Sequence, residues 1–409
     1  MENTVDRFLR YIKVDTQSDR HTTTHPSTAK QFDLANMLVK ELQALGLTDA
    51  AVDDKCYLMA TLPANTTKKI PTLGLIAHVD TSPDMSGTNV NPRIIPEYDG
   101  KPIVLDEATQ TILSPVDFPE LLHYIGQPII TTDGKTLLGA DDKAGVAVIM
   151  SVLETLVTHP EIEHGRLRIG FTPDEETGHG PDFFDVKKFD ADIAYTLDGG
   201  ALGELEYECF NASEAKIHIQ GRNVHPGHSK DMMVNALQLA MDLHAMLPVN
   251  ERPEFTEKYE GFFHLYDFKG TVEEASMVYI IRDHDRAKFE HKEQVMRDAI
   301  KFINLKAGSE RIKLDLVEQY QNMKEVIKDS MHVVDTAKEA MELLGIVPVI
   351  GPIRGGTDGA RLSFMGLPTP NIFAGGLNFH GKYEYLPIRS MEKAVGVVLK
   401  VIELYTNKH

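Results

Sequence analysis

The chain has 409 residues, and its formal net charge at pH 7 is −19 because 61 acidic residues outnumber 42 lysines and arginines. At roughly 150 residues per domain, this length indicates two domains or three, and a hydrophobic content of 42% is typical of a folded globular protein. The acidic excess argues against nucleic acid and against an anionic membrane as partners, since both are bound by basic surfaces.

The N-terminus opens with residues 4–13, whose periodicity predicts a helix. This segment carries acids early and has no apolar core of signal-peptide length. No stretch of the chain approaches the roughly 18 uninterrupted apolar residues that a membrane span requires. Two cysteines, Cys56 and Cys209, are too few for a disulfide framework. We therefore expect a soluble, cytoplasmic protein.

The next part of the chain alternates between helices and strands. A helix is predicted over residues 28–45, beginning at a Ser27/Thr28 cap, and a long apolar helix over 143–156. Continuous apolar runs predict strands buried on both faces at 72–79, 167–171 and 193–197. This order indicates a largely parallel sheet with helices on both sides.

From about residue 210 the pattern changes. Strands are predicted at 215–220, 276–282 and 311–318, with helices at 231–247 and about 284–305 between them. After about residue 325 the earlier style returns, with helices at 330–344 and 390–406 and strands near 347–350 and 370–374. The sequence thus predicts the α/β fold class: an α/β/α catalytic domain with a mostly parallel sheet, residues 1–207 and 321–409, interrupted by a small α+β domain with one open face, residues 208–320.

Acids and histidines fall where the predicted strands end. Three strands lead into His78 and Asp80, into Glu175 and Glu176, and into Asp198, and two loops add Asp141 and His380. In an open α/β sheet, ligands bind outside the carboxyl ends of the strands. These side chains are therefore expected to lie together at one edge of the sheet.

Each of these residues also has an ordinary explanation of its own. Asp198 stands before two glycines, where aspartate is usually a turn residue, and Asp141 could cap a helix. Glutamates after a proline are usually solvated, and a single histidine is usually packed or exposed. Their occurrence together at one sheet edge favours a functional site.

Imidazoles and carboxylates in this arrangement suit a site for two metal ions. The donor types favour zinc, with cobalt or manganese as alternatives. Two divalent ions carry four positive charges, so three ligating carboxylates leave one, which a bridging hydroxide neutralises. A metal pair of this kind lowers the pKa of bound water and stabilises a tetrahedral transition state.

The spacing of the residues separates the ligands from other roles. Residues i and i+2 of a strand point to the same face, so Asp80 lies beside His78, where it can accept the imidazole N–H and fix the tautomer that binds metal. Adjacent residues point in opposite directions, so one of Glu175 and Glu176 can bind metal while the other faces the substrate as a general base. A purely structural site would not need that second glutamate.

In their linear order, these motifs resemble metallopeptidase family M20. The resemblance is carried by His78-Val79-Asp80, residues 139–143 (Gly-Ala-Asp-Asp-Lys), 174–176 (Asp-Glu-Glu), Asp198 and His380-Gly381. It covers essentially the whole chain and is closest to the tripeptide aminopeptidases of the family, on residues 60–65, 130–135 and 354–360. It implies a zinc-exopeptidase-like catalytic domain and a ferredoxin-like lid or dimerisation domain.

The resemblance also implies how the site residues divide. The metal ligands would be His78 and Asp198 for one zinc, Glu176 and His380 for the other, and Asp141 as the bridge. The catalytic residues would be Asp80, which orients His78, and Glu175, the general base that takes a proton from the bridging water and passes it to the leaving amine. No position departs from the ligand pattern of the family.

Two further residues are expected to bind substrate. His225 begins a His-Pro-Gly turn, and the matching histidine of the family approaches the substrate carbonyl, often across a dimer, as an oxyanion donor. The alternative for His225 is a turn histidine. Arg354 resembles the arginine that holds the carboxyl terminus of the peptide. Its alternative is a structural salt bridge, for example to Asp358.

The resemblance therefore implies a di-zinc aminopeptidase that releases the N-terminal residue from tripeptides, with a homodimer through the inserted domain as an option. An amino-acid deacylase or dipeptidase would share the metal motifs, but a deacylase would accept N-acyl amino acids, whereas an aminopeptidase needs a free α-ammonium group. The other alternative is a non-catalytic binding module. An intact Glu175 and a full ligand set argue against it.

Overall fold

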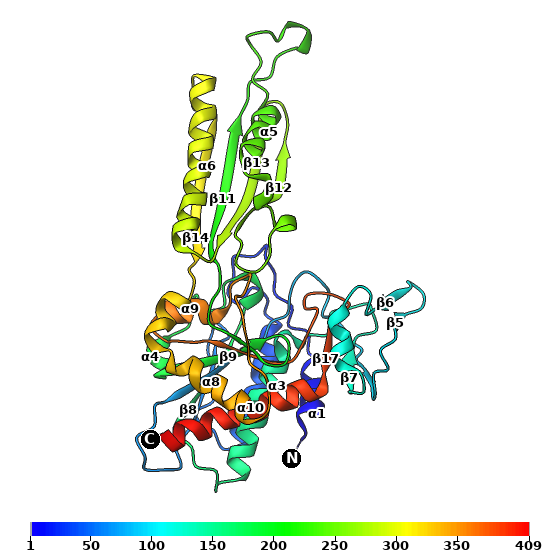
Figure 1. Cartoon of the computed structure of the whole chain (residues 1–409), viewed down its shortest axis with the longest axis vertical. Coiled ribbons are helices and arrows are strands. Elements are labelled where there is room, and N and C mark those ends of the chain that lie inside the picture. The colour runs from blue at the N-terminus through cyan, green and yellow to red at the C-terminus, as the bar shows by residue number, and fades with distance from the viewer. Residues whose placement is uncertain (1, 409) are drawn as a thin grey trace. The chain divides into compact units, whose positions relative to one another are not determined.

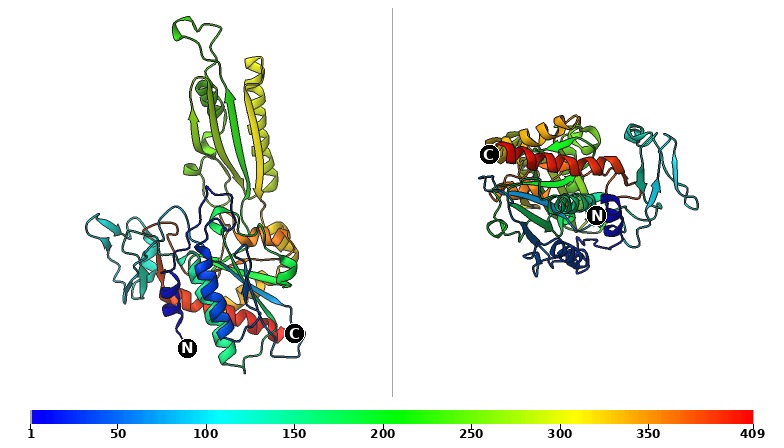
Figure 2. Two further views of the ribbon diagram at one scale, coloured as in Figure 1. Left: turned by 180° about the vertical axis from the view of Figure 1, so that it is seen from behind. Right: turned by 90° about the horizontal axis from the view of Figure 1, so that it is seen from below.

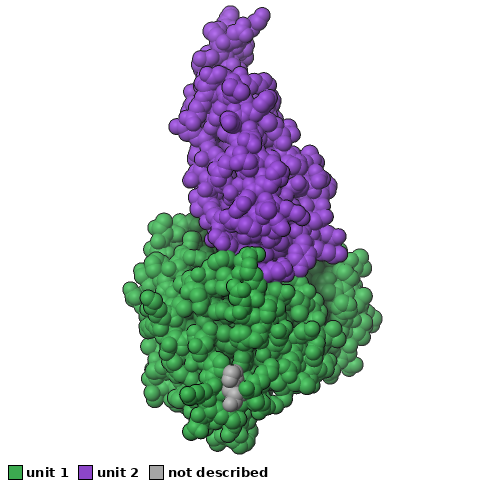
Figure 3. All heavy atoms as spheres, turned by 60° about the vertical axis from the view of Figure 1, so that its left-hand side comes forward, with its two compact units in different colours: residues 1–207, 325–351, 357–409 green, residues 208–324, 352–356 purple. Residues whose placement is uncertain are grey.

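The computed structural model describes residues 2–408 and divides into two compact units (Figure 1, Figure 3). Unit 1 comprises the chain up to Tyr207, Glu325–Gly351 and the chain from Thr357 on, and unit 2 comprises Glu208–Lys324 and Pro352–Gly356. The sequence places the inserted domain at 208–320. The structure extends it to Lys324 and adds Pro352–Gly356, where the Ile353 N–H donates to the Glu208 carbonyl (2.9 Å).

Unit 1 is built on an eight-stranded sheet. The strand order is β1 (Ala51–Val52), β2 (Leu58–Leu62), β8 (Leu167–Thr172), β3 (Leu73–His78), β9 (Ile193–Gly199), β16 (Asn371–Phe373), β10 (Glu204–Glu206) and β15 (Val349–Ile350). The central strands β8, β3, β9 and β16 are mutually parallel, and antiparallel pairs occur toward the edges. The predicted α/β fold with a mostly parallel sheet is confirmed.

Helices cover both faces of this sheet. On one face, α3 (Ala140–Thr158) packs on β3 and β9 beside α1 (Thr4–Tyr11) and α10 (Ile388–Lys408), and α10 also packs on α8 (His332–Leu343) (Figure 2). The other face carries α4 (Val186–Phe189) and α9 (Asp358–Phe364), while α2 (Gln31–Ala44) lies against β1 and β2. The short α7 (Lys324–Ile327) precedes α8 in the chain. Within residues 2–408, each helix is too short or too polar to span a lipid bilayer.

Strand β9 shows why the residues of a central strand are apolar on both faces of the sheet. The Tyr195 hydroxyl donates to the Val333 carbonyl of α8 (2.5 Å), whereas Ala194, on the opposite face, packs with Phe189 and Leu362. Successive strand residues point to opposite faces. A strand covered on both sides therefore reads as a continuous apolar run.

Two small antiparallel sheets lie outside the main sheet. One contains β4 (Arg93–Ile95), β7 (Ile129–Thr131) and β17 (Tyr385–Pro387), and the other contains β5 (Ile103–Asp106) and β6 (Thr111–Leu113). The sequence predicts none of these strands, because runs of three or four residues are too short to show a period. Strand β17 bears on the site, since it follows the loop that carries His380.

Unit 2 is a four-stranded antiparallel sheet with two long helices. Its elements are β11 (Asn211–Gln220), α5 (Ala236–Met246), β12 (Phe262–Gly270), β13 (Glu274–Asp283), α6 (Arg286–Ala307) and β14 (Ile312–Tyr320), with strand order β12-β13-β11-β14. This is the predicted ferredoxin-like arrangement. The sequence does not predict β12, because Phe263 is its one fully buried side chain and the strand lacks a clear alternation.

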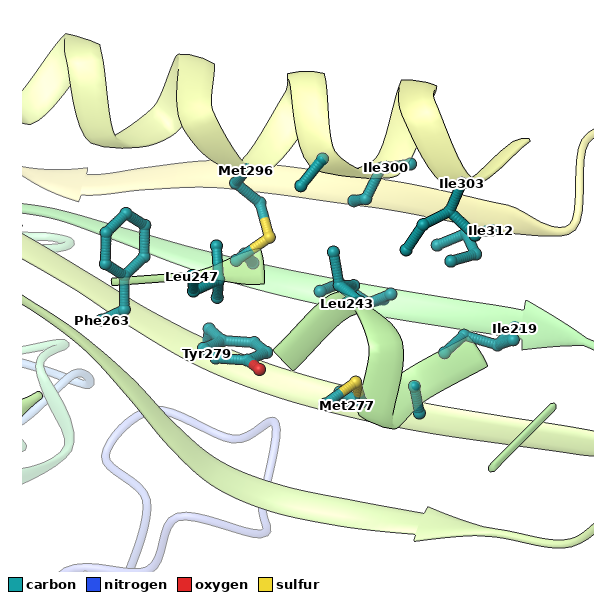
Figure 4. Packing of buried hydrophobic residues seen from close by; sticks show 14 of the residues in the cluster. Ile219, Leu243, Leu247, Phe263, Met277, Tyr279, Met296, Ile300, Ile303 and Ile312 are labelled. Carbon is teal, nitrogen blue, oxygen red and sulfur yellow. The ribbon is translucent and has the colours of Figure 1, made fainter. Parts of the chain in front are cut away.

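Both helices of unit 2 pack on the same face of its sheet (Figure 4). Met296 and Ile303 of α6 and Leu243 of α5 belong to one buried cluster with Ile219 of β11. On β11, buried residues alternate with exposed ones such as His218. The opposite face of the sheet is thus open, as the alternating pattern predicts.

Candidate metal centre

The predicted site residues of unit 1 lie together beyond the carboxyl ends of its central strands. His78 is the last residue of β3, and Asp198 lies near the end of β9. Glu175 and Glu176 form a short turn after β8. Asp141 is the second residue of α3, with a non-helical backbone, and His380 lies in the loop before β17. The buried strands thus fix the positions from which the ligands project.

Asp141 lies between the two imidazoles. Its Oδ1 is 2.9 Å from His78 Nε2, and its Oδ2 is 3.1 Å from His380 Nε2. A second acid completes each side: Asp198 Oδ1 lies 3.5 Å from His78 Nε2, and Glu176 Oε2 lies 2.9 Å from His380 Nε2. The contacts therefore form two histidine–acid pairs that share one carboxylate.

Both glutamates of the turn reach this cluster, but they differ in their contacts. Two groups of potential ligands have atoms within 4.8 Å of one another: His78, Glu175 and Asp198, and His78, Asp141 and Glu176. Glu176 contacts His380 directly. Among residues 2–408, Glu175 makes no ion pair with either imidazole. Glu175 thus belongs to a potential ligand group with His78 and Asp198 but lies outside the two histidine–acid pairs.

The acids of the site are crowded and buried, and this changes their titration. Burial raises the pKa of Asp198 to about 6 and that of Glu176 to about 7, and the charge of Asp141 adds to both shifts. Burial opposes protonation of His380, but Asp141 and Glu176 outweigh it and raise the pKa of His380 to about 11. Carboxylates this close become fully ionised only beside a cation, so the cluster is suited to bound metal.

The donors also fit two divalent ions. Glu176 Oε1 is buried and has no hydrogen-bond partner among the described residues, which leaves a lone pair free for a metal. The two oxygens of Asp141 face different imidazoles, as a bridging carboxylate requires. Nitrogen and oxygen donors without thiolate suit zinc, cobalt and manganese.

Asp80 is fully buried and makes two kinds of contact. His78 Nδ1 lies 3.1 Å from the Asp80 carbonyl oxygen and 3.3 Å from its Oδ1, so the other ring nitrogen, Nε2, is left to bind metal. The carboxylate also accepts the backbone N–H groups of Glu175 (3.1 Å) and Glu176 (3.2 Å). Asp80 therefore fixes both a histidine and the glutamate turn.

Glu384 is a buried acid of the site that the sequence does not reveal. Its carboxylate accepts four successive backbone N–H groups, those of Leu138, Gly139, Ala140 and Asp141, at 2.6 to 3.2 Å. Glu384 follows His380 in the same loop. It thus ties the backbone of Asp141 to the loop of His380.

Replacing Glu384 by Gln should weaken metal binding about ten- to a hundredfold, the usual effect of losing a partner behind a ligand. The side-chain NH₂ group of the glutamine would face backbone N–H groups, which are also donors. At least one hydrogen bond from the backbone to the charged carboxylate should therefore be lost, and we expect this loss to lower the free energy of unfolding by roughly 2–3 kcal/mol. Metal titration and thermal unfolding measure both effects.

Glu403→Gln, at a side chain 50% exposed, is the control and should change neither the metal affinity nor the stability. Unchanged metal affinity in Glu384→Gln would contradict the role.

Two more contacts support proposed ligands and could not be predicted from the sequence. The Asn371 side-chain oxygen accepts the Asp198 N–H (3.0 Å), which fixes the backbone of that ligand. Asp84 Oδ2 lies 3.7 Å from His380 Nδ1, on the side away from the site. Asparagine and aspartate in loops give no local signal of this role.

The two expected substrate residues lie in unit 2. His225 Nδ1 accepts the Gly227 N–H (3.1 Å) and so caps its own turn. The Arg354 guanidinium donates to the carbonyls of Lys258 (2.8 Å) and Glu260 (2.9 Å). It also lies over the rings of Phe210 and Phe262.

Asp358, the acid considered as a salt-bridge partner of Arg354, belongs to unit 1, and its carboxylate accepts the Thr172 hydroxyl (2.6 Å). A sequence separation of four residues suggests a pair, but the chain crosses from one unit to the other between them.

Comparison with known proteins gives close relatives over the full length. Residues 207–309 match the peptidase dimerisation domain of family M20. Curated relatives called peptidase T include those of Alkaliphilus oremlandii, 59% identical and covering 99% of this chain and 100% of its own, and Clostridium acetobutylicum, 57% identical with 100% of both chains covered.

Solved structures with the same fold are more distant in sequence. An aminopeptidase PepT from Bacillus cereus has a TM-score of 0.78 at 24% identity and covers 98% of both chains. A tripeptidase from Staphylococcus aureus has a TM-score of 0.79 at 23% identity, covering 99% of this chain and 98% of its own. A dinuclear metal binding peptidase of family M20 from Bacillus subtilis has a TM-score of 0.66 at 14% identity, with 98% of this chain and 97% of its own covered.

Proposed function

Since this chain belongs to the peptidase T family of M20 peptidases, we propose that it is a tripeptide aminopeptidase that uses two divalent metal ions. The observation that carries the proposal is the position of Asp141 between His78 and His380. The names of the relatives, peptidase T, and of two structural neighbours, an aminopeptidase and a tripeptidase, support the substrate class.

The residues that would hold the metals follow from the contacts. His78 and Asp198 would bind one ion, His380 and Glu176 the other, and Asp141 both. Zinc is the proposed metal, with cobalt and manganese as alternatives. When bound, the ions would lower the pKa of a water molecule and polarise the scissile carbonyl.

Glu175 is the proposed general base. Its carboxylate accepts a proton from the attacking water and then donates it to the leaving amine, so that the water oxygen ends on the new carboxyl group. Burial raises the pKa of Glu175 well above that of a free glutamate, which favours proton uptake by its carboxylate. The Asp80 carboxylate accepts the backbone N–H of Glu175 and so fixes the position of this residue.

Unit 2 is proposed to complete substrate binding and to form a homodimer, as the match to the dimerisation domain suggests. Arg354 would bind the carboxyl terminus of the peptide, exchanging a carbonyl partner for a carboxylate. His225 would donate to the developing oxyanion. Both roles rest on the resemblance to family M20.

Substrate choice tests the proposed function. A tripeptide should be cleaved rapidly with zinc or cobalt, whereas the matching dipeptide and the N-acetylated tripeptide should be poor substrates, because they lack the right length or the free ammonium group. Amino-acid analysis of the products shows which bond is cut. Equal rates on the acetylated and the free tripeptide would overturn the aminopeptidase proposal in favour of a deacylase.

A further inference from the structure

The segment 174–183, which carries Glu175 and Glu176, is fastened at its start by Asp174. This carboxylate is buried and accepts the Ser27 N–H (2.7 Å), the Ser27 hydroxyl (2.5 Å) and the Gln31 amide (2.6 Å). The Asp174 N–H in turn donates to the Gln31 side-chain oxygen (3.2 Å). These bonds join the glutamate turn to the segment before α2.

The end of the same segment is fastened by Tyr57. Its hydroxyl donates to the Gly180 carbonyl (2.6 Å) and accepts the Phe183 N–H (3.1 Å). Tyr57 is buried. One phenol therefore satisfies two backbone groups of the segment, three residues apart.

His25 connects these two attachment points. Its Nδ1 lies 3.2 Å from Asp174 Oδ2, and its Nε2 lies 3.0 Å from the Tyr57 hydroxyl. The imidazole also stacks on the Tyr57 ring, with centroids 5.6 Å apart, and contacts the Phe183 ring at 4.8 Å. A single side chain thus spans from the start to the end of the segment.

We propose that His25 and Tyr57 are positioning residues for Glu175, a role that rests on the proposed function. The glutamate turn is held on two sides: the Asp80 carboxylate accepts its N–H groups, and Asp174, the residue before the turn, is bound through its carboxylate to Ser27. Neither His25 nor Tyr57 contacts a proposed ligand, so they act on the reaction only through this segment. A displacement of about 1 Å in a reacting group can cost on the order of a hundredfold in rate.

The first test is Tyr57→Phe, which keeps the ring and removes only the hydroxyl. We expect kcat for a tripeptide to fall about tenfold or more, with KM within about twofold and both metals retained. Tyr98→Phe is the matched control, because Tyr98 is also buried and its hydroxyl has no partner within residues 2–408. If Tyr57→Phe keeps kcat within about twofold of the control, the proposal is wrong.

A second variant guards against a general loss of packing. In the Glu175→Gln background, Tyr57→Phe should cause no further fall in the residual kcat, since it acts through Glu175. A purely structural effect would multiply the two losses and would overturn the proposal. The kcat of His25→Asn should lie between those of wild type and His25→Ala, because the shorter amide can keep only part of the contacts of the imidazole with Asp174 and Tyr57.

Hydrogen exchange separates this proposal from the proposed function. Tyr57→Phe should speed exchange in peptides that contain the Phe183 amide, whose N–H loses its acceptor. This result does not depend on which substrate is cleaved. A wild-type enzyme without tripeptidase activity would refute the function alone, whereas unchanged exchange at Phe183 would refute the attachment.

Discussion

Glu175→Gln is expected to lower kcat for a tripeptide by about 10²- to 10⁴-fold while both metals stay bound. The amide has nearly the same shape as the carboxylate, but it cannot accept the proton of the attacking water. Metal content should not change, because the histidine–acid pairs at Asp141 do not include this side chain. Steady-state kinetics and metal analysis of the same preparation measure the two quantities.

The neighbouring residue supplies the contrast. Glu176→Gln should lose metal, since Glu176 Oε2 contacts His380 and its other oxygen is buried without a partner among the described residues. Glu163→Gln, at a side chain 56% exposed, controls for the substitution itself and should keep both activity and metal. If Glu175→Gln lost metal and Glu176→Gln kept it, the two roles would have to be exchanged.

The ligand positions could be predicted because each has a local signal. His78 and Asp198 end apolar runs, and parallel strands bring their ends to one edge of a sheet. Asp141 lies in the first turn of a long apolar helix, and its side chain meets His78 at the same edge. In such a fold the backbone pattern fixes the neighbours of a residue, so its chemistry can be read from position and residue type.

Apart from Asp80, the residues that support the ligands could not be predicted, because their partners are far away in the chain. Glu384 accepts the Leu138 N–H from 246 positions away, and Tyr57 donates to Gly180 from 123 positions away. A glutamate before a short strand and a tyrosine after a turn occur in many settings. Only the packing of loops shows that these side chains meet backbone groups near the site.

Arg354 shows that a local signal can suggest a partner that the residue does not need. Asp358 is four residues away and has the opposite charge, yet the guanidinium binds carbonyl groups 94 and 96 positions earlier. The Phe210 and Phe262 rings beneath it favour a delocalised cation. Charge pairing in sequence is a weak guide where a chain passes from one compact unit to another.

Asp141→Asn should remove both metals from the protein, because Asp141 is the residue that both histidine–acid pairs share. Its two oxygens face His78 and His380 separately. The asparagine amide keeps one oxygen as an uncharged metal ligand and turns an NH₂ group toward the other imidazole. One half of the site then loses the negative charge of its ligand, and the other half loses the ligand itself. Activity should fall to that of chelated wild type. Zinc added in excess should restore little of it.

The same variant decides whether the site is shared or consists of two independent halves. With a shared carboxylate, titration of Asp141→Asn with zinc should show both ions weakened together, and the loss should exceed that of Glu176→Gln, which leaves His78 and Asp198 intact. Asp99→Asn, at a side chain 57% exposed, is the control and should bind two ions with wild-type affinity. One ion bound to Asp141→Asn at full strength would show that Asp141 serves a single metal. In that case the repulsion between the carboxylates around Asp141 would have to be reduced by protonation of Glu176 and not by a second metal ion. Burial already raises the pKa of Glu176 to about 7.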